Sequence, residues 1–138
     1  MRSIPRSLAL ACAITLSGGS IAARQLEYVQ RAIGSLPQDC GYFEITFAGA
    51  RPSVLEMKTA LTCITDHAAR RQPAWLRVYG PGIDSKIAHG LFTARDGQLQ
   101  FFSYDSDPSG GSGARARFDT QVCEKPHITD SASVTCTP

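Results

Sequence analysis

The hydrophobic period of the chain changes from helical to extended within residues 53–80, SVLEMKTALTCITDHAARRQPAWLRVYG. Ser53 and Glu56 match a capping box, in which each side chain satisfies a free backbone donor of the other. Apolar residues then recur at steps of three and four, which predicts a helix with one buried stripe, Val54, Met57, Leu61, Ile64 and Ala68. Pro73 ends this helix, and the period-two pattern of residues 74–80 predicts a strand.

The segments on either side of this stretch predict further strands and one more helix. Residues 24–34 have helical spacing, and residues 41–48, 86–94, 98–104 and 114–122 favour strands. Asp96-Gly97 between two of these strands predicts a hairpin with a type I′ turn. Residues 123–138 are expected to form a tail tied back by Cys136. We therefore expect an α+β domain: an antiparallel β-meander of four to five strands, one long helix packed on one face, and a short N-terminal helix.

The N-terminus predicts a signal peptide over residues 1–22, followed by a single disulfide-bonded domain over residues 23–138. Arg2 and Arg6 precede nine uncharged residues, 8–16, a length typical of a signal-peptide core and too short to span a bilayer. Lipid attachment at Cys12 is disfavoured, because Ala9 stands where a lipobox prefers Leu. We expect a periplasmic or secreted protein without a transmembrane segment.

Charge and cysteine usage restrict the classes of partner. The chain carries 14 Lys+Arg and 12 Asp+Glu. Removal of the leader takes away Arg2 and Arg6, so the remaining domain is formally neutral. The chain has no long run of basic residues, so nucleic-acid binding is not predicted. Four cysteines remain after the leader, and an even number in an exported chain predicts two disulfides. Of three possible pairings, Cys40–Cys63 with Cys123–Cys136 closes the shortest loops. The cysteines lack the close spacing typical of zinc sites, so no metal ligands are predicted.

Strand alternation predicts a face that could bind a partner. We assign Leu76, Val78, Leu99, Phe101, Phe118 and Val122 to the side covered by the long helix. The opposite side then carries residues typical of interface centres, namely Trp75, Arg77, Tyr79, Phe102 and Tyr104, with Arg115 and Arg117. Three alternatives remain, in which the first helix, the C-terminal tail or a second copy of the chain covers this face.

The loop at residues 105–113 is a second candidate contact element. Asp105, Asp107, Ser109 and Gly110 match the opening of an EF-hand calcium loop, but Ala116 stands where that loop needs a bidentate Glu. A calcium site of another type, using Asp119 as well, is one alternative. A glycine-rich hairpin loop with Asp and Ser in turn roles is another. Contact with a partner through Asp105 and Asp107 is the third.

These features favour a small exported binding protein, such as an inhibitor, an immunity-type protein or an envelope accessory protein. Its partner would be another protein or an envelope macromolecule, and no cofactor is expected. One alternative is a small hydrolase with a site near Asp84, Ser85, His89 and Asp105, although four extended residues separate Ser85 from His89 by roughly 13 Å. The other alternative is a structural envelope component. No catalytic residue is predicted, and an enzyme is the less favoured class.

Overall fold

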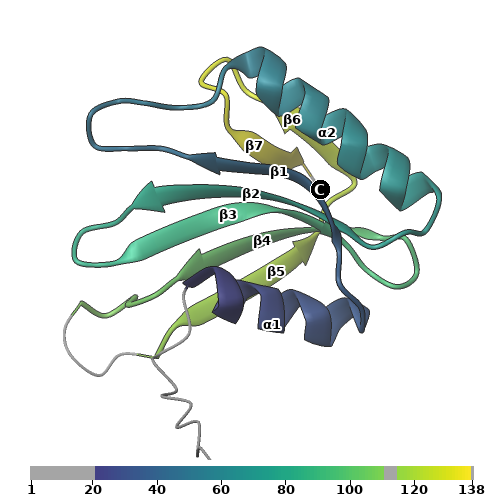
Figure 1. The fold of residues 1–138 in the computed structure, drawn as a ribbon, viewed down its shortest axis with the longest axis horizontal. Coiled ribbons are helices and arrows are strands. Elements are labelled where there is room, and N and C mark those ends of the chain that lie inside the picture. The colour runs from purple at the N-terminus through teal and green to yellow at the C-terminus, as the bar shows by residue number, and fades with distance from the viewer. Residues whose placement is uncertain (1–20, 111–114, 138) are drawn as a thin grey trace, which may run out of the picture.

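The computed structural model describes residues 21–110 and 115–137, which form two helices and seven strands (Figure 1). The expected leader at residues 1–22 falls almost wholly outside the described residues. The elements, in chain order, are α1 (Ile21–Ile33), β1 (Gln38–Glu44), α2 (Val54–Ala69), β2 (Ala74–Pro81), β3 (Lys86–Thr93), β4 (Leu99–Asp105), β5 (Arg117–Val122), β6 (Lys125–Ile128) and β7 (Val134–Thr137).

The first five strands form one sheet in the order β1-β2-β3-β4-β5, and the α+β class is confirmed. The pairs from β2 to β5 are antiparallel, as a meander requires, whereas β1 is parallel to β2. The parallel pair follows from the connection, because α2 carries the chain back to the end of the sheet at which β1 began. The sheet is therefore mostly antiparallel, with one βαβ unit at its edge.

Helix α2 packs on one face of the sheet, and its start is the predicted capping box. The backbone N–H of Glu56 donates to Ser53 Oγ at 3.2 Å, and the N–H of Ser53 donates to Glu56 Oε2 at 2.8 Å. The backbone N–H and the hydroxyl of Ser53 both donate to the Glu56 carboxylate, which favours its charged form and lowers the pKa of Glu56. The most buried side chains of the helix are Met57, Ala60 and Ile64, which pack on Leu76, Val78 and Leu91. The buried stripe is thus centred one residue away from Leu61, which is only half-buried.

The C-terminal residues form a hairpin, β6–β7, which the sequence did not predict. Figure 1 shows this hairpin alongside α2, and Ile128 and Val134 join the core beneath that helix. The Cys123–Cys136 disulfide ties β7 to the end of β5, while Cys40–Cys63 joins β1 to α2. The pairing that closes the shortest loops is confirmed. Two disulfides indicate an oxidising, extracytoplasmic location.

Helix α1 covers the opposite face of the sheet (Figure 1). Its residues Val29 and Ile33 are buried against Trp75, Phe92 and Phe102. The sheet is therefore a middle layer, with a core on each side. Within residues 21–110 and 115–137, neither helix has the length and apolar character needed to cross a bilayer.

The turn between β3 and β4 is a hairpin, as predicted, but its type differs. Ala94 N–H donates to Gln98 O at 2.8 Å, and Gly97 has a φ of 84°. A type I′ turn needs positive φ at both central residues, whereas Asp96 is not in the left-handed region. The β3–β4 connection is a longer loop with Gly97 in the left-handed region. It still joins the two strands as an antiparallel pair, with Thr93 opposite Leu99.

Candidate functional site

The expected aromatic and arginine face lies under α1 and is not open to solvent. Trp75 is 5% exposed, Phe102 0% and Tyr104 2%, and all three belong to the core that α1 closes. Of the three alternatives, the structure shows the one in which the first helix covers this face. The driving force is apolar burial, because Val29 and Ile33 of α1 find their partners there.

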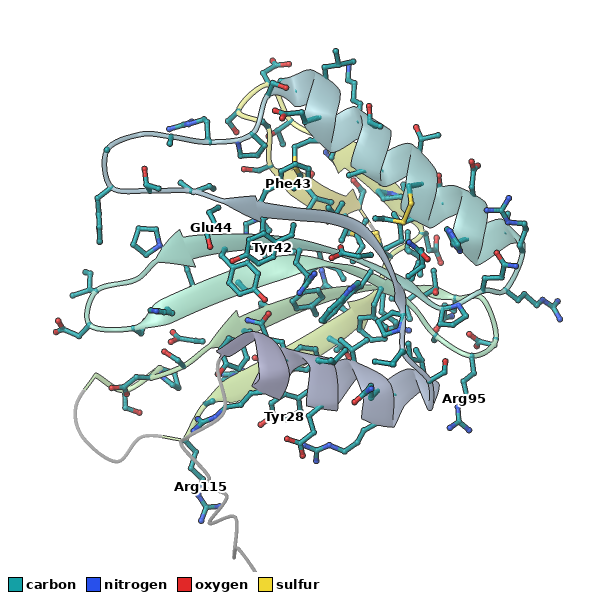
Figure 2. All side chains as sticks on the ribbon, viewed as in Figure 1. Tyr28, Tyr42, Phe43, Glu44, Arg95 and Arg115 are labelled. Carbon is teal, nitrogen blue, oxygen red and sulfur yellow. A yellow bond between two sulfur atoms is a disulfide. The ribbon has the colours of Figure 1, made fainter. Side chains whose placement is uncertain are left out.

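Arg77 is buried on this face by a specific set of partners. Its guanidinium lies 3.8 Å from the centre of the Trp75 ring and pairs with the Asp39 carboxylate. It also lies 5.2 Å from the Tyr42 ring, which projects over the strands on the α1 side (Figure 2). Tyr79 is half-buried beside it and donates from its hydroxyl to Gln25 of α1. Tyr79 thus helps to dock α1 on the sheet, while the partners of Arg77 lie on β1 and β2.

Strand β5 presents the side opposite to the one expected. Arg117 pairs with Asp105 and so lies on the α2 side, while Phe118 pairs with Tyr104 on the α1 side. Phe118 stacks on Tyr28 of α1 with ring centroids 4.9 Å apart and an interplanar angle of 7° (Figure 2 labels Tyr28). The assignment of Phe118 and Val122 to the α2 side was wrong, because the side of each β5 residue follows from its register against β4 and not from local alternation.

A pocket of about 330 Å³ lies on the α2 side of the sheet, beyond the part that α2 and the β6–β7 hairpin cover. The strand register places its residues in two rows that cross β3, β4 and β5. The six side chains that share this side are Ile87, Asp105 and Arg117 in one row, and His89, Ser103 and Asp119 in the next. A pocket of this size is within the range of small ligand sites.

The pocket is lined by apolar surface and by charged or titratable side chains, and one of its carboxylates has no cationic partner in the part of the chain that the structure describes. Arg117 Nε lies 2.5 Å from Asp119 Oδ2, so these two charges pair with each other. Asp105 accepts the backbone N–H of Asp107 at 2.9 Å and makes no ion pair with any described residue. The pocket therefore favours a group that donates hydrogen bonds or carries positive charge.

The residues of the expected hydrolase site are only partly brought together. His89 and Asp105 line the pocket, whereas Asp84 and Ser85 lie in the β2–β3 turn outside it. Ser103 is the cross-strand neighbour of His89 on one side and of Asp119 on the other, so the serine lies between the histidine and the acid. In a catalytic triad the histidine lies between the serine and the acid. This order of residues does not reproduce a triad.

The described part of the 105–113 loop is anchored to the start of β3. Ser106 N–H donates to Lys86 O at 3.0 Å, and Lys86 N–H donates to Ser106 Oγ at 2.9 Å. Residues 111–114 lie outside the described residues. The structure does not group Asp105, Asp107 and Asp119 closely enough for shared coordination of a metal ion, a statement that holds for the described residues. The loop base has Asp in a turn role, with Asp107 N–H bonded to Asp105.

Three connections meet at the same end of the sheet, because β1, β2 and β4 finish there while β3 and β5 begin there. We call residues 45–53, 82–85 and 106–110 the loop end. Phe47 is 88% exposed and Ile83 is 93% exposed, and they come from two different connections of the loop end. The row of Ile87, Asp105 and Arg117 borders it. The loop end therefore combines exposed apolar side chains with the charged side chains of the pocket.

The sequence did contain a signal for this pocket. Ser103 and Asp105 continue the alternation of Leu99 and Phe101, so they had to lie on the side assigned to the long helix. Two polar residues at the end of an otherwise apolar row indicate that the helix does not extend over that end. Arg117 and Asp119 were expected elsewhere, on the opposite face and in an alternative calcium site, because their side depends on the register of β5.

Burial lowers the pKa of His89, since desolvation disfavours the charged imidazolium. The unfolded chain, with a His pKa of about 6.5, then binds protons in a range where the folded chain does not. Stability should therefore fall as pH drops below about 6.5 and level off below the folded pKa. In melting curves from pH 7.5 to 5, we expect wild type to lose more stability than His89→Gln. Parallel curves would contradict this assignment, because Asp105, Arg117 and Asp119 are unchanged in both proteins.

Comparisons of the chain with protein-family models, with curated proteins and with solved structures found no match.

Proposed function

We propose that this chain is a small exported binding protein that contacts another protein through the loop end and the adjoining pocket. The observation that carries the proposal is the exposure of Phe47 and Ile83 on separate connections beside a pocket that contains charged side chains. Apolar anchors near the centre of a contact, surrounded by polar groups, are the usual arrangement of protein interfaces. A rigid sheet that carries such loops is a common scaffold for recognition.

The charges of the pocket indicate which group of the partner it fits. Asp105 has no cationic partner within the described residues, whereas Arg117 and Asp119 neutralise each other. A lysine or arginine side chain of the partner would supply the missing charge and several donors. The proposal is therefore a protein partner that places a basic side chain in the pocket and an apolar patch on Phe47 and Ile83.

Photo-cross-linking in the producing cell tests this proposal. We would replace Phe47 or Ile83 with a benzophenone amino acid and identify the adducts by mass spectrometry. The matched control is Leu36, which is 69% exposed but lies in the connection between α1 and β1, at the other end of the sheet. We expect one protein to cross-link at Phe47 and at Ile83, and not at Leu36.

A charge variant then tests the role of the pocket. Asp105→Asn keeps the size of the side chain and removes its charge, so the adduct at Phe47 should fall about 10-fold or more, consistent with the roughly 1.5–3 kcal/mol of a hydrogen bond to a charged group. Equal cross-linking at all three positions would show non-specific contact and would sink the proposal. An adduct that is unaffected by Asp105→Asn would remove the pocket from the contact.

A further inference from the structure

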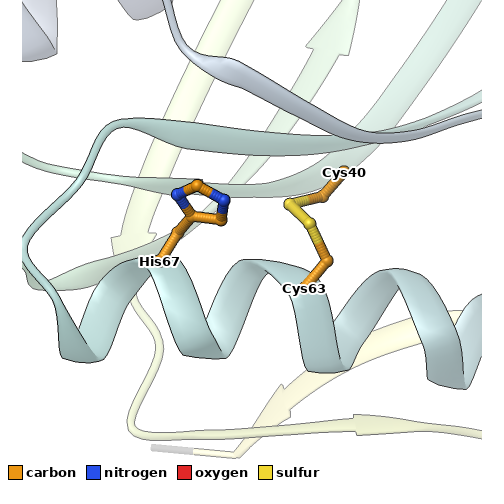
Figure 3. Close-up of side chains that lie close together, drawn as sticks. All are labelled: Cys40, Cys63 and His67. Carbon is orange, nitrogen blue, oxygen red and sulfur yellow. A yellow bond between two sulfur atoms is a disulfide. The ribbon is translucent and has the colours of Figure 1, made fainter.

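Three side chains with metal-binding atoms meet between β1 and α2, away from the loop-end pocket. Cys40 comes from β1, while Cys63 and His67 lie one turn apart on α2 (Figure 3). Their sulfur and ring-nitrogen atoms all lie within 4.8 Å of one another. Two ligands four residues apart on a helix point the same way, and the disulfide holds the third ligand opposite them.

The imidazole of His67 lacks the partner that a buried ring normally has. Its Nδ1 is buried and has no hydrogen-bond partner among the described residues. Such a group costs free energy, which a ligand could recover. His127 makes a contrast within the same chain, because its Nε2 lies 2.8 Å from the Thr135 hydroxyl. His67 therefore brings one ring nitrogen close to the two sulfur atoms, and no described residue bonds to its Nδ1.

Both cysteines of the Cys40–Cys63 disulfide are partly exposed, whereas in the other disulfide only Cys136 is. Cys40 lines a surface pocket of about 390 Å³ together with Phe43 and Leu55, and Leu55 is 75% exposed. Cys123 is only 4% exposed and belongs to the core. Thiol–disulfide exchange requires the attacking thiolate to reach a sulfur atom, and Cys40–Cys63 offers a reductant two partly exposed sulfur atoms.

We propose that Cys40, Cys63 and His67 form a Zn²⁺ site when their disulfide is reduced. A dithiol reductant gives two electrons and two protons to the disulfide and becomes a disulfide itself, leaving two thiols. Zn²⁺ then displaces the two thiol protons and binds two thiolates and the neutral imidazole. This gives three protein ligands and leaves the fourth tetrahedral position to water.

The local structure suits this exchange of a covalent link for a metal link. Thiolates on one zinc ion lie roughly 3.8 Å apart, as Zn–S bonds of about 2.3 Å require. The Cα atoms of Cys40 and Cys63 are 5.6 Å apart, so this separation needs side-chain rotation and no movement of β1 or α2. His67 lies in the last turn of α2, where the negative end of the helix dipole favours a bound cation. In either state β1 stays tied to α2.

Cobalt titration of the reduced chain tests the proposal. We would use the untagged Cys123→Ser/Cys136→Ser variant, reduced by a phosphine, and follow Co²⁺ by thiolate charge-transfer and tetrahedral d–d absorption. We expect one equivalent to bind and Zn²⁺ to displace it. His67→Gln should weaken binding by about 10-fold or more, since even outer-shell partners of a metal are worth about 10- to 100-fold.

The matched control is Cys40→Ser/Cys63→Ser, which keeps the other cysteine pair. That pair belongs to no cluster of three ligands within the described residues, so no tetrahedral cobalt spectrum is expected. Far-UV circular dichroism tells whether each reduced variant is folded. If reduction unfolds the test variant, Zn²⁺ should restore its spectrum. The proposal is overturned if the control binds equally well, if His67→Gln has no effect, or if Zn²⁺ neither binds nor restores the fold.

Discussion

Replacing Gly90 by alanine should destabilise the domain by about 3 kcal/mol or more, at the upper end of overpacking effects. Gly90 lies in the central strand β3, and a Cβ atom there would be 1.9 Å from the carbonyl oxygen of Leu76 and 3.0 Å from the Phe102 ring. The first neighbour is backbone of β2, which cannot move without breaking its pairing on both sides. With typical stabilities of about 5–15 kcal/mol, the loss should appear as a much lower denaturation midpoint in urea.

Gly80→Ala is the matched control for this experiment. Gly80 lies in β2, and its new Cβ would meet only the side chain of Ile87, at 3.6 Å. Alanine restricts the unfolded chain, so we expect this variant to be unchanged or more stable by up to about 1 kcal/mol. A similar loss in both variants would mean that β2 and β3 are not as close at Gly90 as the structure places them.

The elements with strong local signals could be predicted from the sequence. Ser53 and Glu56 marked the start of α2, and Pro73 followed its end, as the structure has it. The β2, β3 and β4 strands alternate so regularly that the side of Leu76, Val78, Leu99 and Phe101 was also correct. These features depend on residues that are close in sequence, which is why patterns alone suffice.

The remaining features depend on contacts between distant segments. The side of Phe118 follows from the register that β5 adopts against β4, and the β6–β7 hairpin is stabilised by Cys136 and by packing under α2. Placement of α1 over Trp75 likewise requires knowing which of two amphipathic helices covers which face. The spacing of apolar residues shows which side of a helix is buried, but it does not show which face of the sheet that side packs against.

The candidate site shows the same division. Asp105 and His89 were singled out from the sequence, and they do share a pocket. Ser103 and Asp119 join them only because three strands pair in one register. Phe47 was expected to continue the strand predicted over residues 41–48, whereas β1 ends at Glu44 and leaves Phe47 in a connection. Ile83 is a single apolar residue in a turn and has no period, so only the structure shows that both side chains stay exposed at one end.

Phe102→Ala should cost about 3–5 kcal/mol, the usual range for removing a large buried aromatic ring. Phe102 is 0% exposed, with ring centroids 5.4 Å from Phe118 and 6.4 Å from Phe92. The truncation leaves a cavity under α1 and removes a ring that links the helix layer to the sheet. The matched control is Phe47→Ala, at 88% exposure, which should change stability by no more than about 0.5 kcal/mol.

This pair of variants also decides between two roles for the aromatic face. If α1 stays docked, Phe102→Ala lowers the denaturation midpoint, and iodide does not quench Trp75, the single tryptophan of the chain. If α1 leaves the sheet in solution, Trp75 is quenched freely, and Phe102→Ala costs little because its ring already contacts water. The second outcome would mean that Trp75, Arg77 and Tyr79 are exposed and can contact a partner, as the sequence predicted. The first, with α1 docked, assigns them to the core and leaves recognition to the loop end, where Phe47→Ala should weaken binding without changing stability.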